Sequence, residues 1–190
     1  MTALRTSPLV KTYTLEEFWK LDEPGERSKL ELIAGVLFMT PPPDATHDAI
    51  VARLLRALAA YLDSSDDKGT LYVPRAALWT ATSTYVEPDL FYVSARLAEK
   101  MGSGRRVGAD LVIEVVSPTS AVYDRTTKAD TYAALGVREL WLVDQSQETV
   151  EVRTLGESGF APGVILCRAQ TLQSSILCGM NFGVDELFRD

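Results

Sequence analysis

The stretch "DLVIEVVSPTSAVYDRTTK", residues 110–128, decides the fold of this chain. Residues 111–116 form a continuous apolar run, the pattern of a strand that lies in the middle of a sheet and is buried on both faces. One carboxylate, Glu114, interrupts the run. Burying an ionised carboxylate is costly unless a cation, a basic partner or a proton compensates its charge. Two interpretations are therefore open: Glu114 reaches solvent or pairs with an arginine, or it binds a metal ion at the edge of a central strand.

The segment after this strand predicts a helix over residues 121–135 that Gly136 ends. Asp124, Lys128 and Tyr132 are spaced four residues apart, so they share one face of that helix. In the simpler interpretation, Asp124 and Lys128 form an exposed ion pair worth about 0.3–0.5 kcal/mol. In the functional one, Lys128 points at a carboxylate site, where it orients a water or stabilises a phosphoryl transition state.

Three further residues are candidates for the same site. Asp89 follows a proline on an earlier predicted strand, where it either forms a turn or converges with Glu114 on one divalent ion. Glu31 is either a third carboxylate or an ordinary hairpin residue. His47, the only histidine, is either a partly buried core residue or a general base near the cleft. With one histidine and two separated cysteines, a zinc site is disfavoured, and carboxylate ligands favour Mg²⁺ or Mn²⁺.

The remaining pattern predicts an α/β or α+β class, with a mixed central sheet flanked by helices. We expect a flexible tail over residues 1–12 and a single domain over residues 13–190. The predicted elements, in chain order, are a helix begun by a Thr14–Glu17 capping box, a hairpin around Ala34-Gly35, a helix over 45–62, strands over 70–81 and 84–93 with an interruption at Pro88, a short helix over 95–101, and strands over 138–144 and 149–155.

Composition limits the function further. The hydrophobic fraction of 46% is ordinary for a globular protein. The chain has no apolar run long enough for a membrane helix and no signal-peptide pattern, so we expect a cytoplasmic protein that does not bind membranes. A formal net charge of −7 argues against a protein that coats nucleic acid, so any DNA binding by the chain alone is expected to be weak. Arg105, Arg106 and Arg125 are the predicted phosphate-facing patch, unless they are simply solvated.

Five segments resemble the Uma2 family, also called DUF820: "LELIAGVL", "PPPDATH", "EPDLFYV", "ADLVIEVVSPTS" and "YDRTTKADTYAALGVRELWLVD". The resemblance covers about residues 13–188 and implies a restriction-endonuclease-like core similar to the PD-(D/E)XK nucleases. It implies that Asp89 and Glu114 are metal ligands. The usual nuclease pattern has a lysine two residues after the glutamate, where this chain has Val116. Members of this family supply the lysine from the following helix, which implies Lys128. Glu31 and His47 also match positions where the family carries Glu and His.

Two function hypotheses follow. The first is an endodeoxyribonuclease that uses Mg²⁺ or Mn²⁺ to hydrolyse phosphodiester bonds. Its predicted catalytic residues are Asp89, Glu114, Lys128, Glu31 and His47, and its predicted substrate contacts are Arg105, Arg106, Asp124 and Arg125. The second is a catalytically degenerate protein of the same fold that acts as a dimeric binding module, motivated by the net charge and the missing lysine at position 116. A homodimer is expected in either case. A third, weaker hypothesis is a nuclease whose DNA affinity comes from a partner.

Overall fold

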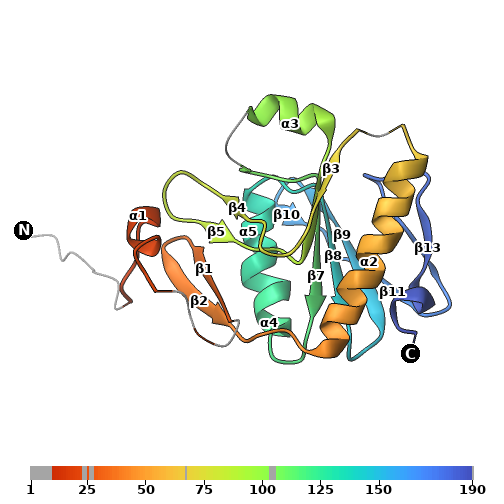
Figure 1. The fold of residues 1–190 in the computed structure, drawn as a ribbon, viewed down its shortest axis with the longest axis horizontal. Helices are drawn as coiled ribbons and strands as arrows, with labels where there is room; N and C mark the ends of the chain where they lie inside the picture. Colours follow the sequence, from red (N-terminus) through yellow and green to blue (C-terminus); the bar gives the residue numbers. More distant parts are fainter. Residues whose placement is uncertain (1–9, 23–24, 26–27, 67, 103–105, 190) are drawn as a thin grey trace, which may run out of the picture.

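The structure is a computed structural model that describes residues 10–22, 25, 28–66, 68–102 and 106–189. Its centre is a seven-stranded sheet with the order β10-β9-β8-β7-β6-β3, in which β11 also pairs with β9 (Figure 1). Only β7 and β8 are parallel within this sheet, so the sheet is mixed, as predicted. Its strands are β3 (Thr70–Tyr72), β6 (Leu90–Val93), β7 (Leu111–Val116), β8 (Glu139–Asp144), β9 (Thr149–Gly156), β10 (Gly159–Phe160) and β11 (Val164–Cys167).

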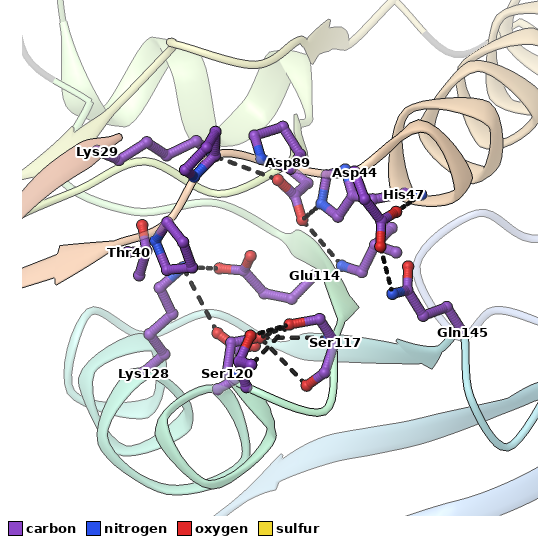
Figure 2. Close-up of a pocket in the computed structure, with 16 residues that line it drawn as sticks. Lys29, Thr40, Asp44, His47, Asp89, Glu114, Ser117, Ser120, Lys128 and Gln145 are labelled. Carbon is purple, nitrogen blue, oxygen red and sulfur yellow. Dashed lines mark hydrogen bonds and ion pairs between the residues drawn. The ribbon is translucent and has the colours of Figure 1, made fainter. Parts of the chain in front are cut away.

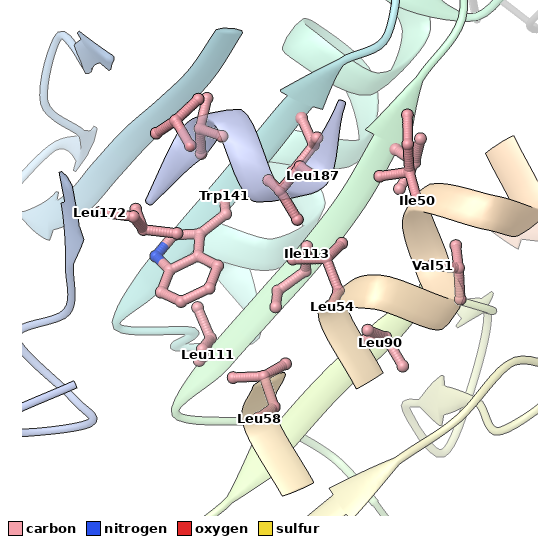
Figure 3. Packing of buried hydrophobic residues seen from close by; sticks show 14 of the residues in the cluster. Ile50, Val51, Leu54, Leu58, Leu90, Leu111, Ile113, Trp141, Leu172 and Leu187 are labelled. Atoms are coloured by element: carbon pink, nitrogen blue, oxygen red, sulfur yellow. The ribbon is translucent and has the colours of Figure 1, made fainter. Parts of the chain in front are cut away.

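The long helix α2 (Ala45–Ser64) covers one face of the sheet. Its apolar stripe of Ile50, Leu54 and Leu58 recurs at helical spacing and packs on β7 and β8 (Figure 3). Asp44 caps the helix because its side chain accepts a hydrogen bond from the backbone N–H of His47, at 2.8 Å. This cap fixes the start of α2 beside the ends of β6 and β7.

The opposite face is covered by the chain that crosses from β7 to β8. The predicted helix over residues 121–135 is present, but a wider π-helical turn, η1 (Asp124–Lys128), separates α4 (Ala121–Tyr123) from α5 (Ala129–Ala134). Both ends of η1, Asp124 and Lys128, are buried. The predicted shared face is therefore turned towards the sheet. Gly136 follows with a φ of +75°, the backbone conformation expected at a helix end.

A second, smaller sheet has the order β2-β1-β5-β4. The predicted hairpin is formed by β1 (Lys29–Ile33) and β2 (Val36–Thr40), and both turn residues, Ala34 and Gly35, have positive φ. The expected strands over 70–81 and 84–93 are each split in two. Their halves β4 (Leu78–Trp79) and β5 (Tyr85–Val86) pair in the small sheet, whereas β3 and β6 pair in the central one.

The remaining helices and strands that the structure describes are short. They are α1 (Leu15–Phe18), α3 (Ala95–Met101), β12 (Thr171–Gln173), β13 (Asn181–Gly183) and the 3₁₀ turn η2 (Val184–Leu187). The capping box of Thr14 and Glu17 is present at α1, as predicted. No helix in the described ranges is both long and apolar enough to span a bilayer. The tail predicted over residues 1–12 falls mostly on residues 1–9, which lie outside the described residues.

Candidate functional site

The two carboxylates predicted to converge do face each other. The antiparallel ladder pairs Leu90 of β6 with Ile113 of β7, so Asp89, one residue earlier, lies opposite Glu114. Residues directly opposite in a ladder point to the same face of the sheet. The backbone N–H of Val115 also donates to Asp89 Oδ2, at 2.9 Å. The carboxylates therefore share one pocket at the end of the two strands (Figure 2).

Asp89 lies between two cationic groups. Lys29 Nζ is 3.2 Å from its Oδ1, and His47 Nε2 is 3.0 Å from its Oδ2. Burial alone would raise the pKa of Asp89, but the hydrogen bond from His47 and the charge of Lys29 hold this pKa well below its usual range. Burial likewise works to lower the pKa of His47, and the contact with Asp89 outweighs it, so that this pKa is raised.

Glu114 is compensated by Lys128, whose Nζ lies 3.0 Å from Glu114 Oε1. The same Nζ is 3.7 Å from Asp124, but only 4% of Lys128 is exposed, so the interpretation as a surface ion pair is wrong. The hydroxyl of Tyr132 also donates to Glu114 Oε1. Together these contacts answer how a carboxylate lies inside an apolar strand.

The pKa values of the groups around Lys128 are raised, because carboxylates outnumber cations in this buried cluster. Burial raises the pKa of Glu114 to about 8, and Lys128 offsets this only in part. Burial would lower the pKa of Lys128, but Glu114 and Glu31 raise it well above its usual value. Burial also raises the pKa of Asp124.

Glu31 is fully buried and lies behind Lys128 rather than at the pocket wall. Its Oε2 is 3.4 Å from Lys128 Nζ and accepts a hydrogen bond from the hydroxyl of Tyr123, at 3.1 Å. Its Oε1 accepts from the backbone N–H of Glu87, at 2.8 Å. Glu31 therefore ties the small sheet to the helical segment that carries Lys128, and contacts the site through that lysine.

The pocket has a cavity volume of about 130 Å³. Its walls bring together five predicted site residues, namely Asp89, Glu114, Lys128, His47 and Asp124. Lys29 and Gln145 are among the wall residues that were not predicted (Figure 2). Lys29 had one signal in the sequence: it precedes Glu31 by two residues on a strand, so both point to the same face. Gln145, whose Nε2 donates to Asp44 at 3.2 Å, had none.

The donor set fits a hard divalent cation held by few protein ligands. Among the residues that the structure describes, no three His, Cys, Asp or Glu side chains are arranged to hold one metal ion. Mg²⁺ commonly binds through one or two carboxylates and keeps several waters. The hydrogen bonds to Glu114, from Lys128 and Tyr132, both go to Oε1, which leaves Oε2 for a ligand. Asp89 and Glu114 thus meet the minimum for Mg²⁺ or Mn²⁺.

The two described arginines of the predicted patch do not line this pocket. Arg106 lies over the rings of Tyr72 and Trp79 and donates to the backbone carbonyl of Ala77. Arg125 is paired with Asp144, at 2.9 Å, and with Glu151. Neither arginine lines the pocket. Arg105 lies outside the described residues.

The mixed central sheet, covered by helices on both faces, has the α+β architecture expected from the sequence. The chain matches the crystal structure of a "putative nuclease belonging to DUF820" from Anabaena variabilis, with a TM-score of 0.73 and 19% sequence identity. The match covers 92% of this chain and 97% of that chain, and at this identity it shows the fold alone.

The chain belongs to the Uma2 family. The sequence model of this family, described as "Putative restriction endonuclease", matches residues 15–184. The family and the fold class expected from the sequence are both confirmed. No curated protein matches the chain.

Proposed function

We propose that this chain is a nuclease that uses Mg²⁺ or Mn²⁺ to hydrolyse phosphodiester bonds in DNA. The observation that carries the proposal is the position of Asp89 and Glu114, which face each other on adjacent strands at one pocket. Lys29 contacts Asp89, and Lys128 contacts Glu114. Both lysines add positive charge where a phosphate would enter the pocket. The descriptions of the family and of the Anabaena variabilis protein support the same class of reaction.

Asp89 and Glu114 would hold the metal ion. When bound, such an ion polarises a phosphoryl oxygen and lowers the pKa of a water. Lys128 fixes the orientation of Glu114 through their 3.0 Å contact, and its charge counters the negative charge that develops on the phosphate. His47 orients Asp89 in the same way, through Nε2.

Hydrolysis joins the oxygen of a water to phosphorus while the bond to the leaving oxygen breaks. The water loses a proton to solvent, and the leaving oxygen gains one. We assign the donation of this second proton to Lys29. Its ammonium lies at the pocket wall with a single carboxylate contact, whereas Lys128 is held by three carboxylates.

A cleavage assay on labelled DNA tests the proposal. Asp89→Asn and Glu114→Gln should each lower metal-dependent cleavage by about a hundredfold or more. The matched control is Glu99→Gln, which changes an exposed carboxylate on α3 and should leave cleavage unchanged. Circular dichroism confirms that each variant is folded. Full cleavage by a folded Asp89→Asn or Glu114→Gln would remove the assignment.

A second candidate function is favoured by one observation. Lys128 is paired with Glu114, Glu31 and Asp124, and Val116 occupies the position of the usual lysine. This arrangement suits a catalytically silent binding module, for which a homodimer is the predicted assembly. A thermal melt with added Mn²⁺ separates the two candidates. A nuclease site is stabilised by about 2.7 kcal/mol at a hundredfold excess of Mn²⁺ over Kd, and a silent site is not stabilised.

A further inference from the structure

A second hollow, the side groove, adjoins the acidic pocket. It has a volume of about 410 Å³, and Phe38, Met39, Val122 and Tyr123 form its apolar wall. Thr40, Pro41, Thr119 and Ser120 line both hollows. Anything bound in the acidic pocket therefore has the side groove directly beside it.

The side groove has the chemistry of a site for a flat ring. The rings of Phe38 and Tyr123 stack with their centroids 4.9 Å apart. Met39 and Val122 are 68% and 79% exposed, which is a large exposure for apolar side chains. Hydroxyl groups complete the wall, and no described charged residue lines it. Such a groove suits a nucleobase, which has an apolar face and a hydrogen-bonding edge, and offers nothing to a phosphate.

The charge distribution points the same way. Proteins that track duplex DNA neutralise many phosphates with Lys and Arg, but this chain has a formal net charge of −7. The cations of the acidic pocket, Lys29, His47 and Lys128, all contact carboxylates. Stacking of one base on aromatic side chains adds about 1–3 kcal/mol of affinity that does not depend on the phosphate charge.

We propose that the side groove binds the unpaired base next to the phosphate held in the acidic pocket, so that the substrate is single-stranded nucleic acid. This inference rests on the proposed nuclease function. A base within a duplex is stacked and paired, and its extrusion costs a few kcal/mol, which a single groove does not repay. Single-stranded segments present the base without that cost.

Fluorescence anisotropy with Ca²⁺ present tests the proposal. The probes are a labelled single strand of about twelve nucleotides and a hairpin of the same base composition, whose two arms are joined by a non-nucleotide linker so that it has no unpaired base. The wild type should bind the single strand at least about tenfold more tightly than the hairpin, because only the single strand offers an unstacked base. Val122→Asp should weaken binding of the single strand by about fivefold or more. Val164→Asp is the matched control, since Val164 is 64% exposed on β11, outside both hollows, and should change nothing.

Met39→Asp repeats the test at the other side of the side groove, in case Val122→Asp does not fold. Equal binding of strand and hairpin, unchanged binding by both groove variants, or no binding of the single strand would each overturn the inference. A measurement of the molar mass in solution tests one further occupant of the side groove, a second copy of this chain. If Val122→Asp converts a dimer to a monomer and leaves strand binding unchanged, the side groove is an interface and the inference is wrong.

Failure of this inference is distinguishable from failure of the nuclease proposal. Cleavage that requires Glu114 but does not distinguish strand from hairpin removes only the role of the side groove. Cleavage that survives Glu114→Gln removes the nuclease assignment, whatever the substrate.

Discussion

Replacing Lys128 by methionine tests the charge balance of the site. Methionine is apolar, with a flexible unbranched side chain, but it lacks the ammonium group. The substitution leaves Glu114, Glu31 and Asp124 without the cation that lies 3.0, 3.4 and 3.7 Å from them, and each of the three is at most 4% exposed.

The expected loss follows from these contacts. Removing one partner of a buried ion pair costs about 3–5 kcal/mol, because the other charge remains buried. We expect the lower value, about 3 kcal/mol at neutral pH, for two reasons. Glu114 has a pKa raised to about 8, so it already holds its proton at neutral pH and is not left as a buried charge when the cation is lost. The hydroxyl of Tyr132 also still donates to it. For a chain of this size, the loss lowers Tm by about 6–12 °C.

Urea unfolding, followed by tryptophan fluorescence, measures this loss, because Trp141 is fully buried and reports on the core. The matched control is Lys20→Met. Lys20 pairs with Glu16 at 2.7 Å, but both side chains are at least 70% exposed, so its loss should cost at most about 0.5 kcal/mol. The double variant Lys128→Met with Glu114→Gln should recover about 1 kcal/mol or more, because glutamine at this buried position needs neither the lost cation nor a proton taken up on folding.

A cost for Lys128→Met no larger than that of Lys20→Met would contradict this charge balance. So would a double variant in which the Glu114→Gln change gives no recovery. In either case Lys128 would not be the charge partner of Glu114, and the pocket would need another explanation for its buried carboxylates.

Three further predictions concern pH, the α2 cap and the hairpin turn. The folded chain keeps the Glu114 proton up to about pH 8, whereas the unfolded chain releases it near 4.5. The free energy of unfolding therefore falls as the pH rises between these values. Because Mn²⁺ needs the ionised carboxylate, it should raise Tm more at about pH 8.5 than at about pH 6.5. Asp44→Ala and Ser94→Ala each remove a helix cap, and each should lower stability in urea unfolding by about 1 kcal/mol. Only Asp44→Ala should also reduce the stabilisation by Mn²⁺, because α2 starts at the pocket. Gly35→Ala should cost about 1–2 kcal/mol in the same assay, because its φ is +83°, while Ala34→Gly at φ +49° should be neutral or stabilising.

Local pattern was enough to predict most of the fold. The apolar spacing of Ile50, Leu54 and Leu58 predicts α2, and the unbroken run around Glu114 predicts the central strand. The split of the strands over 70–81 and 84–93 was not predicted. Each half pairs with a different sheet, and partner choice depends on strands far away in the sequence. The π-helical turn that places Lys128 also has no marker in local composition.

The site was predicted where local sequence sets a residue apart. Glu114 interrupts an apolar run, and Lys128 shares a helical face with Asp124 and Tyr132. Arg125 was a reasonable phosphate ligand from the sequence, but its partners Asp144 and Glu151 come from β8 and β9, so its charge is already used within the fold. Lys29 looked like an ordinary residue at the start of a strand. Its role depends on a contact with Asp89, sixty positions later in the chain.

The parallel pairing of β7 with β8 has a consequence for how the chain folds. β7 lies between β6, which precedes it, and β8, which follows only after the helical crossover that carries Lys128. Until that crossover docks, burial of β7 would enclose an uncompensated carboxylate. The order of assembly is therefore constrained: the middle strand and the lysine-bearing helix must enter the core in one cooperative step. A chain emerging from the ribosome cannot complete the acidic pocket before Gln145 is made, whereas the core on the α2 face also needs residues up to Phe188.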